Sequence, residues 1–157
     1  MSKPGAILVA RIRTDLPELA FLVERARQGW GKAKSINDDF YLDGVALNLH
    51  SFYSGLEKIF EKIATTVDGS VPNAANWHQE LLRQMSMEIP KVRPAVISQE
   101  MRDMLEDYCG FRHVVRNVYA HHLKPEKIEM LITKILPVLE KLTAELNAFA
   151  TFLQEAE

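Results

Sequence analysis

The chain has 157 residues, of which 47% are hydrophobic and 25% are charged, with a net charge of −2 at pH 7. These values are typical of one globular domain over residues 1–157 and exclude a disordered chain. The near-neutral charge also excludes a protein that coats nucleic acid through charge alone. The single cysteine, Cys109, cannot form an internal disulfide, so we expect a cytoplasmic protein with a small buried thiol. No apolar run is long enough for an export signal or a membrane span.

Apolar residues recur at alternating steps of three and four, which is the spacing of helices with one buried face. Four such runs follow one another in the chain: Leu16–Trp30, Leu42–Val67, Met101–Val118 and Ile128–Leu153. No strand-like alternation occurs. The sequence therefore predicts an all-α protein, an antiparallel four-helix bundle.

The expected helix boundaries carry residues typical of caps and breaks. Asn37–Asp39 can cap the second helix, Asp68–Ser70 with its central glycine ends it, and Ser98 can cap the third. Pro125 suits the first turn of the last helix, whereas Pro137 lies inside that helix and should bend it. Three prolines interrupt residues 71–97, where one additional short helix is predicted from Trp77 to Met87, with Trp77 packed onto the bundle.

The stretch "FRHVVRNVYAHHL", residues 111–123, concentrates arginine and histidine on one helix surface. At helical pitch Arg112 and Arg116 form one row, and His113, Asn117 and His121 form a neighbouring row, both opposite the apolar face. No acidic residue follows until Glu126, so nothing nearby in the sequence neutralises the surface. Because Arg116 and His121 are five residues apart, they converge only if the helix ends near Ala120 or a second chain contributes the partner.

Three interpretations of this surface remain open. Basic side chains near a helix C-terminus interact favourably with the helix dipole without further function. A metal site from His113, His121 and His122 is disfavoured because adjacent histidines diverge and no carboxylate or thiolate completes the set, so no metal or other cofactor is expected. The favoured interpretation is phosphate chemistry, in which Arg116 grips phosphate oxygens, His121 moves a proton, and Asn117 orients either group. We also expect Arg112, His113, His122 and Lys124 to contact the phosphates of an RNA.

The motif of Arg116, Asn117 and His121 resembles the signature of HEPN-domain ribonucleases. The surrounding text is similar to the HepT-like branch from about Phe40 onward, in the segments "LNLHSFYSGLEKIFEKIA", "NWHQELLRQM", "RPAVIS" and "YCGFRHVVRNVYAHHL". The resemblance implies a HEPN-like bundle that forms a homodimer and joins its two motifs in one cleft. It further implies a metal-independent endoribonuclease, the toxin of a pair whose antitoxin is an MNT-type nucleotidyltransferase.

The sequence departs from that family pattern at one position. The best-known toxins carry a tyrosine two residues after the histidine, which the antitoxin modifies with AMP, and this chain has Leu123 there. Tyr119 is the nearest tyrosine and is the candidate for such modification. Two other functions stay open: a catalytically inactive bundle that binds a nucleotidyltransferase, and a regulator that binds a nucleotide.

One polar face of the second predicted helix is less informative. His50, Ser54 and Glu57 share the side opposite its apolar run. They either line the same cleft or form a solvated face, and helix amphipathicity favours the solvated face.

Overall fold

The helices account for nearly all of the regular structure. A computed structural model describes residues 2–117, 119 and 122–156. The elements are α1 Lys3–Ser35, α2 Tyr41–Ile63, a π-helical turn η1 Ala64–Asp68, α3 Trp77–Met85, α4 Gln99–Asn117, α5 Pro125–Thr133 and α6 Ile135–Glu155. Within these described ranges the only strand-like pairing is an isolated bridge between Ile89 and Arg93. The predicted all-α class is confirmed.

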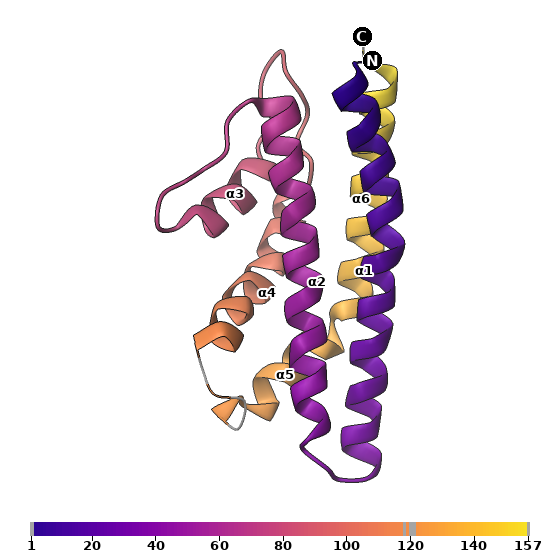
Figure 1. Ribbon diagram of the computed structural model, residues 1–157, viewed down its shortest axis with the longest axis vertical. Helices are drawn as coiled ribbons and strands as arrows, with labels where there is room; N and C mark the ends of the chain where they lie inside the picture. Colours follow the sequence, from indigo (N-terminus) through magenta and orange to yellow (C-terminus); the bar gives the residue numbers. More distant parts are fainter. Residues whose placement is uncertain (1, 118, 120–121, 157) are drawn as a thin grey trace.

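The bundle is built around α2 (Figure 1). The long helices α1 and α2 lie side by side and run in opposite directions, and α6 packs against α1. On the other side of α2 lies α4, with α3 packed against both of them. The two ends of the chain lie next to each other at the end of the bundle opposite the α1–α2 turn. Helix α4 also contacts α6, whereas α3 lies on the outside of the bundle against α2 and α4.

Helix α1 is longer than its apolar run predicts. It begins directly after Ser2, whose side-chain oxygen accepts a hydrogen bond from the Gly5 N–H at 3.1 Å. Buried Leu8 and Ile12 continue the stripe toward this end. Helices α1 and α2 approach closely at Gly55, where an added Cβ would lie 2.9 Å from Leu19 Cδ2 and the Leu19 side chain would have to shift.

The predicted cap of α2 by Asn37–Asp39 is wrong, because the N-cap residue is Phe40 and no side chain caps this end, whereas the other predicted boundaries of α2 and α4 hold. Helix α2 passes into η1, which ends at Gly69 in the left-handed conformation (φ 70°) that glycine adopts without strain. Ser98 caps α4, since its hydroxyl accepts a hydrogen bond from the Met101 N–H at 3.0 Å. The short helix α3 begins at Trp77 as predicted and ends at Met85, two residues earlier than predicted.

The last predicted helix is two helices rather than one bent helix. Pro137 has no N–H to donate to the carbonyl of Thr133, four residues earlier, and its ring crowds that carbonyl. Helix α5 accordingly ends at Thr133, and α6 begins at Ile135. The break places α5 across the end of the bundle, below α4 (Figure 1). Pro125 occupies the first turn of α5, as predicted.

A buried ion pair fixes the segment between α3 and α4. Arg93 and Asp68 side chains are 0% and 2% exposed, and Arg93 Nε lies 2.6 Å from Asp68 Oδ1. The same guanidinium also donates to the carbonyls of Gln84, Met87 and Pro94. These contacts join the end of η1 to α3 and to the chain that leads into α4.

In the part of the chain that the structure describes, no helix combines the length and apolarity of a membrane span.

Candidate functional site

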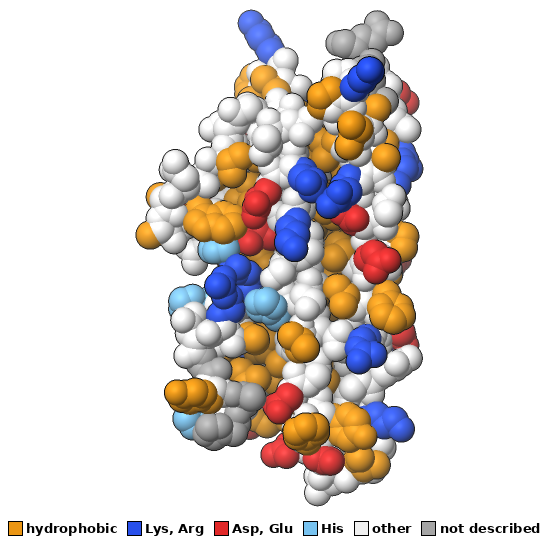
Figure 2. All heavy atoms as spheres, in the orientation of Figure 1, with side chains coloured by type: hydrophobic (Ala, Val, Ile, Leu, Met, Phe, Trp, Pro, Cys, Tyr) orange, Lys and Arg blue, Asp and Glu red, His pale blue; other side chains and the backbone are white. Residues whose placement is uncertain are grey.

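The arginine-rich face of α4 opens onto a groove beside α3. Arg112 and Arg116, one turn apart, both line this groove, as do His78 and Gln79 of α3. Its volume is about 540 Å³, and the other lining residues are Ala75, Asn76, Cys109, Gly110, His113 and Asn117. Figure 2 shows Lys or Arg and His side chains gathered on this face. We call this hollow the α3–α4 groove.

Glu57 of α2 lies behind the groove and contacts two of its residues. His78 Nδ1 is 2.9 Å from both carboxylate oxygens of Glu57, and Arg112 Nε is 3.9 Å from Oε1. Arg112 Nη1 is 3.3 Å from His78 Nε2. The Glu57 side chain is only 5% exposed. The arginine face predicted to lack a neutralising carboxylate is therefore in part neutralised, by a residue of another helix.

The expectation that the polar face of α2 is solvated is wrong. Glu57 is buried, and α3 and α4 cover the side of α2 that carries it. Two atoms of this face, His50 Nε2 and Ser54 Oγ, are buried and have no hydrogen-bond partner among the described residues. The pKa of His50 is lowered from 6.5, mainly by burial and then by the positive charges of Arg112 and Arg116, while Glu57 opposes the shift. The lowered pKa favours the neutral form of His50 beside the two arginines of the groove.

Arg116 is exposed at the mouth of the groove. It forms no ion pair with any carboxylate of the described residues, unlike Arg112. Its guanidinium therefore keeps its full capacity to donate to an anion. The two arginines differ accordingly: one is held from behind by α2 and α3, and the other faces outward.

Asn117 turns back onto its own helix. Its Nδ2 donates to the carbonyl of His113 at 2.7 Å and lies 3.3 Å from His113 Nδ1. The predicted row of His113 and Asn117 is thus present, with the amide nitrogen engaged in the last turn of α4. Helix α4 ends at Asn117. It is therefore shorter than an unbroken helix through the whole motif.

The second half of the motif follows the end of α4. Tyr119 is 77% exposed, His122 and Lys124 are exposed, and the Tyr119 and His122 rings lie 6.2 Å apart. Leu123, whose side chain has no hydroxyl, packs against the hydrophobic core. The predicted proton-transfer residue His121 lies outside the described residues, as do Val118 and Ala120. The prediction that the helix ends near Ala120 falls on the same segment.

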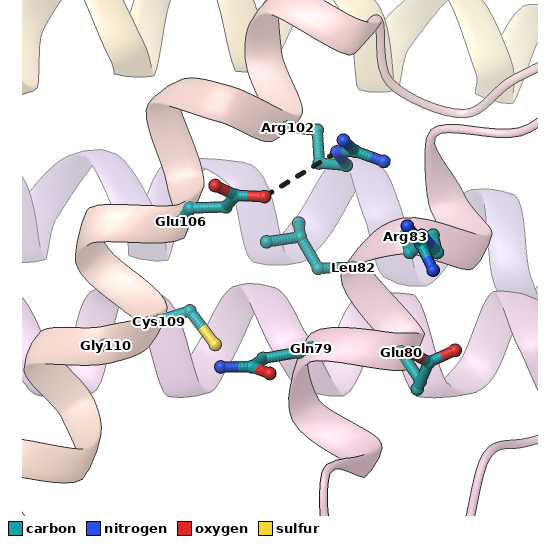
Figure 3. A pocket seen from close by; sticks show the side chains of 8 residues that line it. All are labelled: Gln79, Glu80, Leu82, Arg83, Arg102, Glu106, Cys109 and Gly110. Atoms are coloured by element: carbon teal, nitrogen blue, oxygen red, sulfur yellow. Dashed lines mark ion pairs between the residues drawn. The ribbon is translucent and has the colours of Figure 1, made fainter.

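A second hollow adjoins the groove on the same side of the molecule (Figure 3). It shares Gln79, Cys109 and Gly110 with the groove, so the two hollows adjoin at these residues between α3 and α4. Its charges are mixed, because Arg102 lies 3.8 Å from Glu106. The remaining lining residues are Glu80, Leu82 and Arg83. Positive charge without a matching carboxylate is therefore greater at the Arg116 end.

Cys109 lies at the junction of the two hollows with its sulfur directed toward Gln79 (Figure 3). The residue is 8% exposed, and burial raises the pKa of its thiol. A thiol with a raised pKa is a poor nucleophile. The predicted role as a small buried side chain is confirmed.

Nowhere in the described ranges do three or more histidine, cysteine or acidic side chains gather closely enough to hold a metal ion.

Sequence reasoning identified the arginines of α4 but not their partners. Glu57 and His78 are 55 and 34 residues away from Arg112, and no spacing rule links them to it. One available signal was the acidic residue on the polar face of α2, together with a histidine beside the tryptophan of α3. Only the packing of α3 on α2 and α4 brings them together.

The fold and the groove define a small helical-bundle protein with paired arginines and several histidines over one depression. The sequence matches the family described as HepT-like protein over residues 44–153, which is more than half of the chain. The chain therefore belongs to the HepT-like family, and the resemblance seen in the sequence is confirmed. The comparisons with curated proteins and with solved structures found no match to the chain.

Proposed function

We propose that this HepT-like chain is a metal-independent endoribonuclease whose centre joins two copies at a homodimer cleft. The observation that carries the proposal is the exposed Arg116 beside Arg112 in a groove that also holds histidines. Arg116 binds the scissile phosphate and His121 transfers protons. Asn117 supports both, and His113, His122 and Lys124 contact flanking phosphates.

The reaction that these residues suit needs only acid–base chemistry. The ribose 2′-hydroxyl attacks the adjacent phosphorus while one histidine accepts the hydroxyl proton. The bond from phosphorus to the 5′-oxygen breaks, and a second, protonated histidine donates a proton to that oxygen. The guanidinium of Arg116 offsets the negative charge that builds on the phosphate. The products are a 2′,3′-cyclic phosphate and a 5′-hydroxyl, so end-group analysis of the fragments tests this route.

The decisive experiment measures RNA cleavage by the purified protein in the presence of a chelator. His121→Ala and Arg116→Ala should each lower the rate by about a hundredfold or more, the usual effect of removing a proton-transfer or charge-stabilising group. Arg25→Ala removes the same charge from an exposed position of α1, away from the groove, and should retain wild-type activity. If the His121 variant cut RNA as fast as the parent protein, the role assigned to His121 would be wrong.

A second function is favoured by Leu123, which packs against the core where related toxins carry a modifiable tyrosine. In this alternative the chain is an inactive bundle that binds a nucleotidyltransferase or a nucleotide. Under the first function, by contrast, Tyr119, with its 77% exposure, is the candidate for AMP transfer by an MNT-type partner. A dimeric protein that fails to cut any RNA would favour this alternative, and added nucleotide would raise its melting temperature if it binds one.

A further inference from the structure

The contacts around His78 define which of its ring nitrogens carries the proton. A carboxylate only accepts hydrogen bonds, so the Nδ1 that lies 2.9 Å from both Glu57 oxygens must donate. A guanidinium only donates, so the Nε2 that lies 3.3 Å from Arg112 Nη1 must accept. Both contacts are hydrogen bonds only if His78 is neutral and protonated on Nδ1.

The ring of His78 is also held in place by its neighbour. The rings of Trp77 and His78 lie 3.6 Å apart at an angle of 31°, and Trp77 packs against the hydrophobic core. Glu57 belongs to α2, and its side chain is 5% exposed. The pair formed by Glu57 and His78 is therefore a rigid support, built from two helices, behind the guanidinium of α4.

Arg112 is only partly used by this support. Its side chain is 15% exposed, and its Nε is buried without a hydrogen-bond partner in the described part of the chain. Of the remaining donors, Nη1 contacts His78, and Nη2 donates to no described residue. Arg112 lines the groove one turn from Arg116, so Nη2 is the donor that it retains for an anion there. A guanidinium held at one nitrogen by a fixed acceptor is suited to bind a phosphate with its remaining N–H groups.

We propose that Glu57 and His78 are positioning residues that hold Arg112 as a phosphate-binding fork in the α3–α4 groove. The identity of the ligand, a phosphate of single-stranded RNA, rests on the proposed function. Glu57 fixes the tautomer of His78, and His78 then presents an acceptor to Arg112. The alternative is that Glu57 only neutralises the charge of Arg112 and does not position its guanidinium.

Substitutions of His78 by neutral amides test whether the pair of Glu57 and His78 positions Arg112. The probe is a short RNA with 2′-O-methyl groups, which cannot be cut by its own 2′-oxygen, and binding is measured by fluorescence anisotropy at several salt concentrations. His78→Asn can still donate to Glu57 but cannot reach Arg112, so the affinity should fall about three- to tenfold. His78→Gln can reach Arg112 with its amide oxygen and should stay closer to the wild type.

Salt dependence identifies the phosphate contact itself. Arg112→Ala should weaken binding by about tenfold or more and lower the salt slope by about 0.7, the value for one lost contact to a single strand. The His78→Asn variant should lower the slope in the same direction, although its charge is unchanged. A structural defect alone would not move this slope. The matched control, Arg25→Ala on α1, should alter affinity much less because this residue lines neither the groove nor the hollow beside it.

Glu57→Gln distinguishes the two roles of Glu57 by the direction in which the RNA affinity changes. If Glu57 only neutralises Arg112, removing its charge makes the groove more positive and should strengthen RNA binding. If Glu57 positions His78 and Arg112, the same change should weaken binding. Stronger binding by the Glu57 variant, or unchanged binding by His78→Asn, would overturn the positioning role. Glu61→Gln, one turn further along α2, is the charge-matched control.

The tautomer is measured separately, in the protein without RNA. Long-range ¹H–¹⁵N NMR should show His78 protonated on Nδ1 in the wild type, and a proton on Nε2 would overturn the inference. A protein that binds the probe in this manner but cuts no RNA would contradict the proposed function and leave the positioning role intact. If the wild-type protein cuts RNA but the His78 variants bind the probe as well as the wild type, the positioning role would be wrong and the proposed function would stand.

Discussion

His50 is the residue whose environment most directly links the groove to pH. Burial, Arg112 and Arg116 lower its pKa from 6.5, in that order of size. Its folded pKa lies below its unfolded value, so the unfolded chain binds more protons just below pH 6.5. The free energy of unfolding should therefore fall as the pH drops through this range. His50→Gln cannot titrate and should lose less stability between about pH 7.5 and about pH 5.5, measured by urea denaturation. Parallel curves for the two proteins would contradict this.

At the same scale, the sequence predicted one half of the groove. Arg112 and Arg116 were assigned to one face because residues four apart on a helix are neighbours, and both do line the groove. Glu57 was assigned to a solvated face because amphipathicity describes one helix at a time. Which helix covers a polar face depends on tertiary packing, and here α3 and α4 cover it. The ion pairs of the site are therefore properties of the packed bundle.

At the scale of elements, the buried pair of Arg93 and Asp68 ties α3 to the rest of the bundle. Arg93→Ala would leave the Asp68 carboxylate buried without its partner and should lower the free energy of unfolding by about 3–5 kcal/mol. Arg27→Ala breaks the exposed pair with Glu24 and should cost no more than about 1 kcal/mol. Chemical denaturation of both variants checks the difference. Equal losses would show that the buried pair does not hold this segment.

Helix positions were more predictable than helix breaks. Apolar spacing located α2, α4 and the two C-terminal helices, and Ser98, Gly69 and Pro125 marked their ends correctly. Pro137 was predicted to bend one helix, yet the helix is interrupted at Lys134, between α5 and α6. Proline affects the carbonyl four residues earlier, so the break falls before the proline itself. Whether such a site bends or breaks depends on what the freed segment packs against, and α5 packs on α1 and α2.

At the scale of the whole molecule, the proposed centre needs two copies of the chain. One copy supplies a single motif histidine, His121, whereas the proposed cleavage uses one histidine as base and another as acid. A twofold axis through the α4 ends would bring two motifs together and give both roles to equivalent side chains. The requirement can be tested without knowing the geometry of the interface.

Mixing inactive and active subunits measures this requirement. After subunit exchange with a tenfold excess of His121→Ala protein, most wild-type subunits would pair with an inactive copy. If each centre needs both histidines, the activity per wild-type subunit should fall by about tenfold. The assay uses RNA in excess over total protein, so that the variant cannot compete for substrate, and an equal mass of an inert protein controls for crowding. Light scattering must show dimers in both samples. Activity that stays proportional to the wild-type subunits alone would mean that each chain carries a complete centre, and the composite site would be wrong.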